Sequence, residues 1–289
     1  MVDKSGTTVT FKYAQVNGNY HPSEIIDADG HSTTITYATT DTGSTITIAA
    51  PDGRVTALHT KALDSETYGT DNSLLEKIVY PDGETVSFDY TMETGTYSFT
   101  GSSGGLSIQY ALLNQVTYDT GAKLHYAYEM RDVKLGSGHL NTYRLTERYT
   151  TNGTDDMQRI DRAAYSYTGD YSRETTYKTA VSEVKNGHTV RTEYTFNKDH
   201  LCTLQEIQVD GATKQKVETT YDSYELPNKV VQTVHDTDAL SATELYTHDK
   251  YGNTLTYFSP KAEGKTKNTN YRTTYTYDSA YNLPLTVEY

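Results

Sequence analysis

Residues 246–255 read Tyr-Thr-His-Asp-Lys-Tyr-Gly-Asn-Thr-Leu, and residues 275–284 read Tyr-Thr-Tyr-Asp-Ser-Ala-Tyr-Asn-Leu-Pro. Both stretches alternate ring-bearing and Thr residues up to an Asp, pass through a polar segment, and resume with a Leu. Alternation with period two is typical of a β-strand, and Gly and Asn tolerate the positive φ that a tight turn requires. Each stretch therefore predicts a strand, a turn and a returning strand.

Similar turn-forming residues recur at regular intervals along the chain. Between Gly187 and Gly252 the predicted turns follow one another at roughly 12–14 residues, which is one strand plus one turn. They fall near Gly187, 198–199, Gly211, 224–225, 237–238 and Gly252. No amphipathic helix interrupts this rhythm. We therefore expect an all-β fold, an antiparallel β-meander of successive hairpins.

Seven dipeptides mark hairpin turns, because Asn-Gly and Asp-Gly favour the two-residue turns that join antiparallel strands. They are Asn17-Gly18, Asp29-Gly30, Asp52-Gly53, Asp82-Gly83, Asn152-Gly153, Asn186-Gly187 and Asp210-Gly211. Three stretches rich in Gly, Ser, Lys and Asp break the rhythm and predict longer loops, near 60–73, 130–141 and 259–270. No shift in composition marks a domain boundary, so residues 1–289 are expected to form one continuous hairpin array.

Further copies of the opening pattern begin at residues 78, 116 and 220, and their shared core is Tyr-x-Tyr-Asp-x-x-Gly-Asn-x-Leu. Several such copies at hairpin spacing resemble the YD-repeat (RHS-repeat) family. The resemblance is sharpest from about Tyr110 onward, and Tyr281 departs from it by standing where the family usually has Gly. The residues that define the repeat are Tyr118, Asp119, Tyr221, Asp222, Tyr246, Asp249, Gly252, Asn253, Tyr275, Tyr277 and Asp278.

The resemblance implies more than the residues alone establish. In RHS, teneurin-like and toxin-complex shell proteins of this family, the hairpins wind into a curved, spiralling sheet that becomes a hollow shell. This chain would then be an excised segment of a larger bacterial secreted or cell-surface protein, forming part of a shell whose partners are the rest of the parent chain or an encapsulated cargo. Family members that release cargo carry an Asp-Pro-rich self-cleaving segment, and no Asp-Pro dipeptide occurs in this sequence.

Composition excludes several other classes of protein. The 289 residues carry a net charge of −13, which disfavours nucleic acid, since phosphate binding needs a basic face. One Cys excludes a disulfide framework, and the lack of 18 consecutive apolar residues predicts no transmembrane helix. The first residues form no charged, apolar-cored leader, so we expect no signal peptide in this sequence. With 28 Tyr and only 35% hydrophobic residues, we expect Tyr on one face of the sheet and Thr, Lys and Glu on the other.

Candidate chemical sites are weak. Residues 101–105, Gly-Ser-Ser-Gly-Gly, match a nucleophile elbow, but the next residues alternate like a strand, which favours a Gly/Ser loop. His200 and Cys202 supply only two metal ligands. The pairs Asp27 with Asp29 and Asp236 with Asp238 resemble calcium loops without the remaining ligands, which favours hairpin turns. Residues 152–154 form a glycosylation sequon. No catalytic, cofactor or metal site is expected.

The functional hypotheses are therefore three. The first is the structural and interaction role that the family resemblance implies. The second is a carbohydrate-binding adhesin module that stacks a glycan on exposed Tyr rings. The third, a glycoside hydrolase-like enzyme, requires a cleft that holds a carboxyl of raised pKa. In addition, an edge strand with unpaired backbone groups predicts edge-to-edge self-association.

Overall fold

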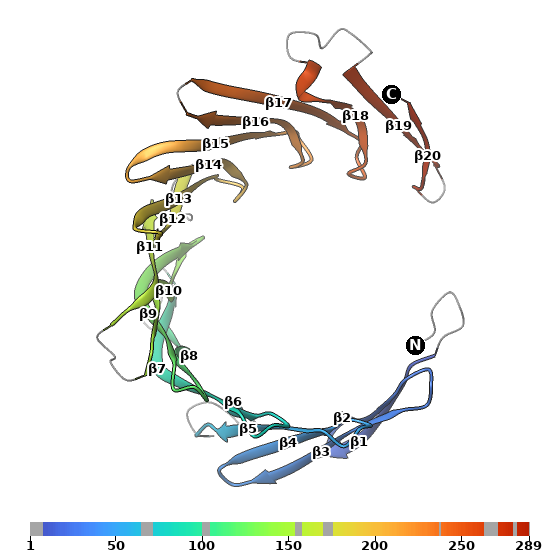
Figure 1. The fold of residues 1–289 in the computed structure, drawn as a ribbon, viewed down its shortest axis with the longest axis vertical. Coiled ribbons are helices and arrows are strands. Elements are labelled where there is room, and N and C mark those ends of the chain that lie inside the picture. Colours follow the sequence, from blue (N-terminus) through green and yellow to red (C-terminus); the bar gives the residue numbers. More distant parts are fainter. Residues whose placement is uncertain are drawn as a thin grey trace. The chain divides into compact units, whose positions relative to one another are not determined.

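The computed structural model describes residues 8–64, 72–99, 105–153, 158–169, 176–236, 238–262, 271–279 and 282–288. Twenty β-strands and one short 3-10 helix account for its regular structure, which confirms the all-β antiparallel fold (Figure 1). None of the described helical residues belongs to a helix long and apolar enough to cross a bilayer. Contacts between Cα atoms divide the chain into two units, and each is described by itself.

Unit 1 comprises residues 1–97, 105–127 and 148–160. Its strands are β1 (Thr10–Val16), β2 (Asn19–Ile26), β3 (Ser32–Thr40), β4 (Gly43–Ala49), β5 (Val55–Ala62), β6 (Ser73–Val79), most of β7 (Thr85–Phe99), and β8 (Gly105–Tyr118). From β1 to β7 each strand pairs antiparallel with the next. The predicted meander is therefore present in this unit.

Unit 2 comprises residues 98–104, 128–147 and 161–289. Its strands are β11 (Ile160–Thr168), β12 (Thr176–Lys185), β13 (His188–Asn197), β14 (Cys202–Val209), β15 (Ala212–Tyr221), β16 (Pro227–His235), β17 (Ala239–His248), β18 (Thr254–Phe258), β19 (Arg272–Tyr277) and β20 (Pro284–Glu288). The 3-10 helix η1 (Pro260–Ala262) follows β18. All ten strands pair antiparallel in chain order. Strands β9 (Lys123–Leu135) and β10 (Gly138–Thr151) contribute residues to both units.

Two kinds of turn join these strands. Asn17-Gly18, Asn186-Gly187 and Asp210-Gly211 are two-residue turns in which both residues have positive φ, as in Asn186 (53°) and Gly187 (81°). This is the type I′ geometry that matches the twist of a hairpin, and it confirms the predicted turns. The Asp-Gly pairs at 29, 52 and 82 lie in longer loops of a second kind. Asn152-Gly153 follows β10, and the residues after it lie outside the described ones.

The predicted loop at 130–141 is wrong. The structure instead continues β9 to Leu135, turns at Gly136-Ser137, and starts β10 at Gly138. The reason is alternation that the polar composition concealed, since Val133 is fully buried between exposed Asp132 and Lys134. The stretches at 60–73 and 259–270 do contain breaks between strands, but residues 65–71 and 263–270 lie outside the described part of the chain.

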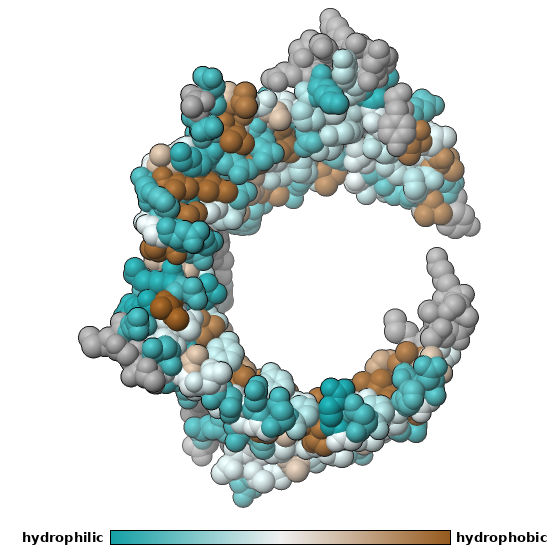
Figure 2. Space-filling model, in the orientation of Figure 1, coloured by the Kyte–Doolittle hydropathy of each residue, from teal (hydrophilic) through white to brown (hydrophobic). Residues whose placement is uncertain are grey.

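The sheet has almost no closed core. Within the described residues only four apolar side chains are buried, namely Val116, Val133, Ala163 and Ala180. Most strand residues are half-exposed on both faces, and hydrophobic residues form small separate groups in the view of Figure 2. A sheet packed against a second layer would bury a continuous apolar face. Each unit is therefore stabilised mainly within its own sheet, by backbone pairing and cross-strand side-chain contacts.

The two faces of unit 2 differ in chemistry, as the composition predicted. The register pairs Tyr177 with Phe196, whose rings stack at 5.1 Å. The opposite face of the same strands carries Lys178 and Glu193, joined by an ion pair of 2.6 Å. Aromatic rings can cover backbone on a half-exposed face while their hydroxyl groups stay hydrogen-bonded. Tyr thus replaces the aliphatic residues of an ordinary core.

Candidate functional site

Several of the repeat residues lie in, or directly before, loops of a single design. In each loop the first N–H donates to the carbonyl of the fifth residue, and the fourth N–H donates to the carbonyl of the first. The fourth residue has positive φ, as in Gly252 (89°). This is a type I turn followed by a left-handed residue, the common three-residue hairpin loop. Seven such loops occur in the described residues, at 27–31, 50–54, 80–84, 118–122, 197–201, 222–226 and 249–253.

The Asp of the Tyr-Asp pair closes the loop. Asp222 Oδ1 accepts the N–H of Tyr224 at 2.8 Å and that of Leu226 at 3.1 Å. Asp249 Oδ1 does the same for Tyr251 at 2.8 Å and Asn253 at 3.0 Å. One carboxylate oxygen thereby satisfies two loop N–H groups that the turn itself leaves unpaired. The role of Asp in the repeat is thus to fix the loop backbone.

The same hydrogen bonds lower the pKa of both carboxyls. At Asp249, the hydrogen bond from the Asn253 amide lowers the pKa most, partial desolvation opposes it, and the loop N–H groups lower it further. At Asp222, desolvation pushes the pKa up, but the hydrogen bonds from Leu226, Tyr224 and His248 together outweigh it. Both groups therefore hold their negative charge more strongly than an isolated Asp does.

In a second version of the loop, the Asp that accepts a loop N–H is the third residue of the loop and not the first. Asp82 Oδ1 accepts the N–H of Glu84, and Asp52 Oδ1 accepts that of Arg54, each at 3.1 Å. In the 118–122 loop Tyr118 itself occupies the first position, so Asp119 is the exposed second residue. Tyr118 and Asp119 therefore lie one position later than Tyr221 and Asp222. In sequence the two pairs look equivalent because both are Tyr-Asp dipeptides. Their positions within the loops differ, and the dipeptide alone does not show this.

Two of the repeat Tyr residues tie their loops to the preceding hairpin. Tyr221 Oη donates to the carbonyl of Cys202 at 2.6 Å, and Tyr277 Oη donates to the carbonyl of Thr254 at 3.0 Å. Both acceptors are the first residue of a strand that leaves the previous loop. A backbone bulge directly precedes Tyr221 and Tyr277. The shared geometry of these two links joins each of these hairpins to the one before it by a side-chain hydrogen bond.

His248 occupies the Tyr position of its loop and makes a different link. Its Nδ1 lies 3.0 Å from Asp222 Oδ2, with 8% of the His248 side chain exposed. Asn253 and Asn282 extend the contact to the next turn through paired amides, with Asn253 Nδ2 at 2.6 Å from Asn282 Oδ1. At Asp278 the loop is one residue longer, since its N–H donates to Leu283. Tyr281 lies outside the described residues.

Tyr246 and Tyr275 precede their Asp by three residues and lie on the sheet face. Tyr246 and Tyr257 are cross-strand partners with ring centroids 5.1 Å apart, and both hydroxyls contact the Glu244 carboxylate, at 3.1 and 2.7 Å. The hydrogen bond to Glu244 raises the pKa of Tyr257 to about 12. Tyr275 pairs with Val287 on β20. This aromatic group stabilises the face between the loops.

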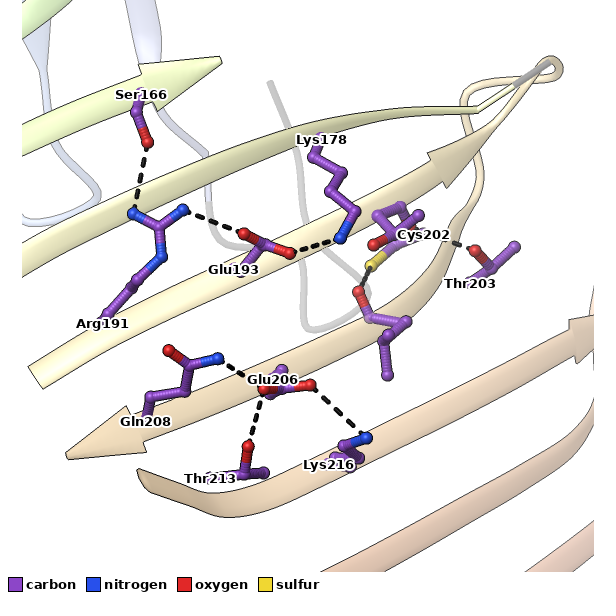
Figure 3. A network of polar contacts seen from close by, with 12 residues as sticks. Ser166, Lys178, Arg191, Glu193, Cys202, Thr203, Glu206, Gln208, Thr213 and Lys216 are labelled. Atoms are coloured by element: carbon purple, nitrogen blue, oxygen red, sulfur yellow. Dashed lines mark hydrogen bonds and ion pairs between the residues drawn. The ribbon is translucent and has the colours of Figure 1, made fainter. Parts of the chain in front are cut away.

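The opposite face of unit 2 carries a polar ladder that sequence reasoning did not single out (Figure 3). Glu193 and Glu206 stand directly opposite each other on β13 and β14, an arrangement that costs stability unless it is compensated. Lys178 and Arg191 contact Glu193 at 2.6 and 2.9 Å, while Lys216 lies 3.5 Å from Glu206. Sequence reasoning could have found this ladder only with the strand register known. Two carboxylates at paired positions then predict neighbouring Lys or Arg side chains that compensate their charge.

Of the other sequence candidates among the described residues, Asp27 and Asp29 come together with His31, and these three exposed residues place one possible ligand atom each within 4.8 Å of one another. His200 Nδ1 lies 3.1 Å from Tyr177 Oη, and the Cys202 thiol donates to the carbonyl of Leu204 at 3.6 Å. Asp27 closes a loop of the shared design by accepting the N–H groups of residues 29 and 31, which confirms the predicted turn. Asp236 and Asp238 lie in the break between β16 and β17. The motif at 101–105 and Thr154 involve residues outside the described ones.

Comparisons with known proteins add a structural likeness only. No family model matches the sequence, and no curated protein matches it. The crystal structure of TcdB2-TccC3-TEV is similar over 99% of this chain and 17% of that chain, with a TM-score of 0.35 and 10% sequence identity.

Proposed function

We propose that the chain is a non-catalytic structural and interaction segment of a larger secreted or cell-surface repeat protein of the YD-repeat type. In this proposal its sheet forms part of a β-shell that encloses a cargo or presents an adhesive surface. The observation that carries the proposal is the recurrence of one loop, closed by Asp222 or Asp249, together with the links that Tyr221, His248 and Tyr277 make to the hairpin before each of them. A design that repeats along the chain can be extended by adding hairpins.

The shortage of buried apolar side chains supports an enclosing or interacting role. A sheet whose two faces are both half-exposed gains stability when further hairpins or a partner cover it. The end of unit 2 has this property, because all five residues of β20 are exposed and Leu283 and Leu285 are 60% and 64% exposed. We infer that β20 is covered by a following element of the parent chain.

The electrostatics support a non-catalytic role. Every Asp or Glu of the described residues whose pKa is clearly displaced is displaced downward, as at Glu193 and Glu206. A glycoside hydrolase needs one carboxyl whose pKa is raised, so that it can act as an acid at neutral pH. These carboxyls stabilise the structure as anions.

Hydrogen exchange measured on the isolated chain and on the protein encoded by the whole reading frame tests the proposal. We expect the amides of β20 to exchange rapidly in the isolated chain and to be strongly protected in the longer protein, since a following hairpin would pair with them. The strands β13 to β16 serve as an internal control and should exchange alike in both. Equal exchange of β20 in the two proteins would overturn the proposal that this sheet continues.

A further inference from the structure

A pocket of about 760 Å³ lies in unit 1, where three hairpins end beside one another. The hairpins are β1–β2, β3–β4 and β5–β6, and residues at the chain reversal of each line the pocket, among them Asn17, Asp41 and Asp64. Small-molecule sites in proteins have volumes of about 300–1,000 Å³. The space is therefore large enough for an organic ligand.

The base of the pocket is fixed by the backbones of β4 and β5. A Cβ atom at Gly43 would collide with the Thr60 carbonyl oxygen, so only glycine lets the two strands approach this closely. The Ser44 N–H donates to Thr60 Oγ1 at 3.1 Å. Two residues further along β5, the Ala62 N–H donates to the Thr42 carbonyl at 2.9 Å. The site is thus preformed, and little ordering is needed on binding.

Part of the pocket surface is apolar. Tyr37 and Ile46 are cross-strand partners on β3 and β4, and both line the pocket together with Leu63. The Tyr37 hydroxyl donates to the Pro22 carbonyl at 2.9 Å, so the polar end of this side chain is already paired. A ligand in the pocket therefore meets carbon surface that suits methylene groups.

The charge of the pocket selects the class of ligand. Asp41 and Asp64 line it, whereas no Lys or Arg of the described residues does. Asp41 is exposed and forms no ion pair with any described residue. Lys61 stands on β5 between Thr60 and Ala62, which both line the pocket, so the alternation of the strand directs the Lys61 side chain to the opposite face. The pocket therefore has a negative potential that attracts cations.

The donor groups suit an organic cation better than a metal ion. A metal ion such as Ca²⁺ needs several oxygen atoms that converge at about 2.3–2.6 Å. Within the described part of the chain, three metal-binding side chains come together only at Asp27, Asp29 and His31, which do not line this pocket. An alkylammonium group instead donates up to three hydrogen bonds, and the side-chain oxygens of Asn19 and Ser44 on the pocket wall can accept them beside the carboxylates.

We propose that this pocket binds an aliphatic polyamine. Its ammonium groups pair with the Asp41 and Asp64 carboxylates, and its methylene groups pack on Tyr37, Ile46 and Leu63. The site goes beyond the structural role proposed above, because a segment of a shell does not require a preformed acidic pocket. It also stands independently of that role, since every lining residue belongs to unit 1 whether or not the sheet continues.

Calorimetric titration of the whole chain with spermidine tests this site. We expect one spermidine to bind per chain, and the affinity to fall at least about fivefold between roughly 50 and 300 mM NaCl, because salt screens the charges of an open pocket. Octane-1,8-diol has a similar length without charge and should not bind at the same concentrations. Asp41→Asn and Asp64→Asn each keep the size of the side chain and should each weaken spermidine binding at least about fivefold, since a charge-assisted hydrogen bond is lost.

Asp119→Asn is the matched control. It removes the same charge from a loop of unit 1 that does not line the pocket, so it should leave the affinity for spermidine unchanged. Circular dichroism and thermal unfolding establish that each variant is folded. The proposal is overturned if spermidine does not bind at millimolar concentration or if octane-1,8-diol binds as tightly. It is also overturned if folded Asp41→Asn and Asp64→Asn bind as well as the original chain, or if Asp119→Asn weakens binding as much as they do.

Discussion

Single carboxylate oxygens fix the loops of this protein, and their removal is the sharpest test at the residue scale. Asp249→Ala deletes the acceptor of the Tyr251 and Asn253 N–H groups. We expect it to lower the free energy of unfolding by about the contribution of one to two hydrogen bonds, measured by urea denaturation. Asp249→Asn keeps an acceptor oxygen and should recover most of the loss.

Asp119→Ala is the control for that measurement. Asp119 is exposed and occupies the second position of its loop, where the two backbone bonds of the turn are made by Tyr118. We expect its replacement to change the stability by less than about 0.5 kcal/mol. Equal losses for Asp119→Ala and Asp249→Ala would contradict the assignment of the loop cap.

Glu225 is a residue whose side chain disfavours the backbone conformation that its loop requires. It stands at the left-handed position with φ of 63°, where Gly30, Gly53 and Gly252 stand in other loops. A side chain at such a φ costs roughly 1–2 kcal/mol, which exceeds the entropic cost of glycine in the unfolded chain. Glu225→Gly should therefore raise the free energy of unfolding by about 0.5–1 kcal/mol in the same urea assay. A loss of stability would show that the Glu225 side chain makes a contribution larger than this strain.

Consecutive hairpins are linked by tyrosine hydroxyls, and this is the feature to test at the scale of elements. Tyr277→Phe removes the hydrogen bond to the Thr254 carbonyl without changing the ring. We expect a loss of about 0.5–1.5 kcal/mol, together with faster hydrogen exchange in β18 and β19. Tyr251→Phe, which alters a hydroxyl on an exposed ring, should change neither quantity.

The meander could be predicted from the sequence because its signals are local. The turns at Asn186-Gly187 and Asp210-Gly211 depend on dipeptides that favour positive φ, and alternation identified the strands between them. The loop caps were recognised as a motif, but the roles of Asp222 and Tyr221 needed coordinates. The hydrogen bonds of the Asp222 carboxylate lie within a loop of five residues. The hydroxyl of Tyr221 instead donates to a carbonyl 19 residues earlier.

Other features were hidden because they depend on register. The facing carboxylates Glu193 and Glu206 are 13 positions apart in the sequence and become neighbours only when β13 pairs with β14. Likewise, the hairpin at Gly136-Ser137 was concealed by charged residues on the exposed side of its strands. The pattern of polar and apolar residues along the chain does not specify the register, that is, which residue of one strand pairs with which residue of the next.

At the scale of the whole molecule, lowered carboxyl pKa values make the fold sensitive to acid. The ordinary values are 3.8 for Asp and 4.5 for Glu, and in the folded chain Glu193, Glu206, Asp222 and Asp249 lie below them. The unfolded chain therefore binds more protons near pH 4, so the stability these groups supply is complete above their ordinary values and is lost as pH falls through the folded ones.

Urea unfolding at pH 7, 5 and 3 measures this effect. We expect similar midpoints at pH 7 and 5 and a clearly lower midpoint at pH 3. Glu206→Gln removes one of the titrating groups, so the difference between pH 7 and pH 3 should become smaller in that variant. A midpoint that does not fall between pH 5 and pH 3 would contradict the downward shifts.

Self-association is the second prediction at this scale. The exposed strand β20 pairs with β19, and an edge strand with apolar residues invites pairing with another copy. We expect light scattering to show dimers of the isolated chain at high concentration, and Leu285→Lys to shift them toward monomers. Leu240→Lys, at an exposed position on β17, is the control. A strict monomer at every concentration would rule out edge pairing.

The chain of hydroxyl and amide links between hairpins also determines how the protein would respond to tension. Force applied to the two ends of an antiparallel meander breaks the hydrogen bonds between its paired strands one after another. We expect each unfolding event to stop at the next loop that an Asp side chain closes. Asp222 and Asp249 are 27 residues apart. A repeat that gives way would therefore lengthen the chain by about 90 Å, and the force trace of a single stretched molecule would advance in steps of that size.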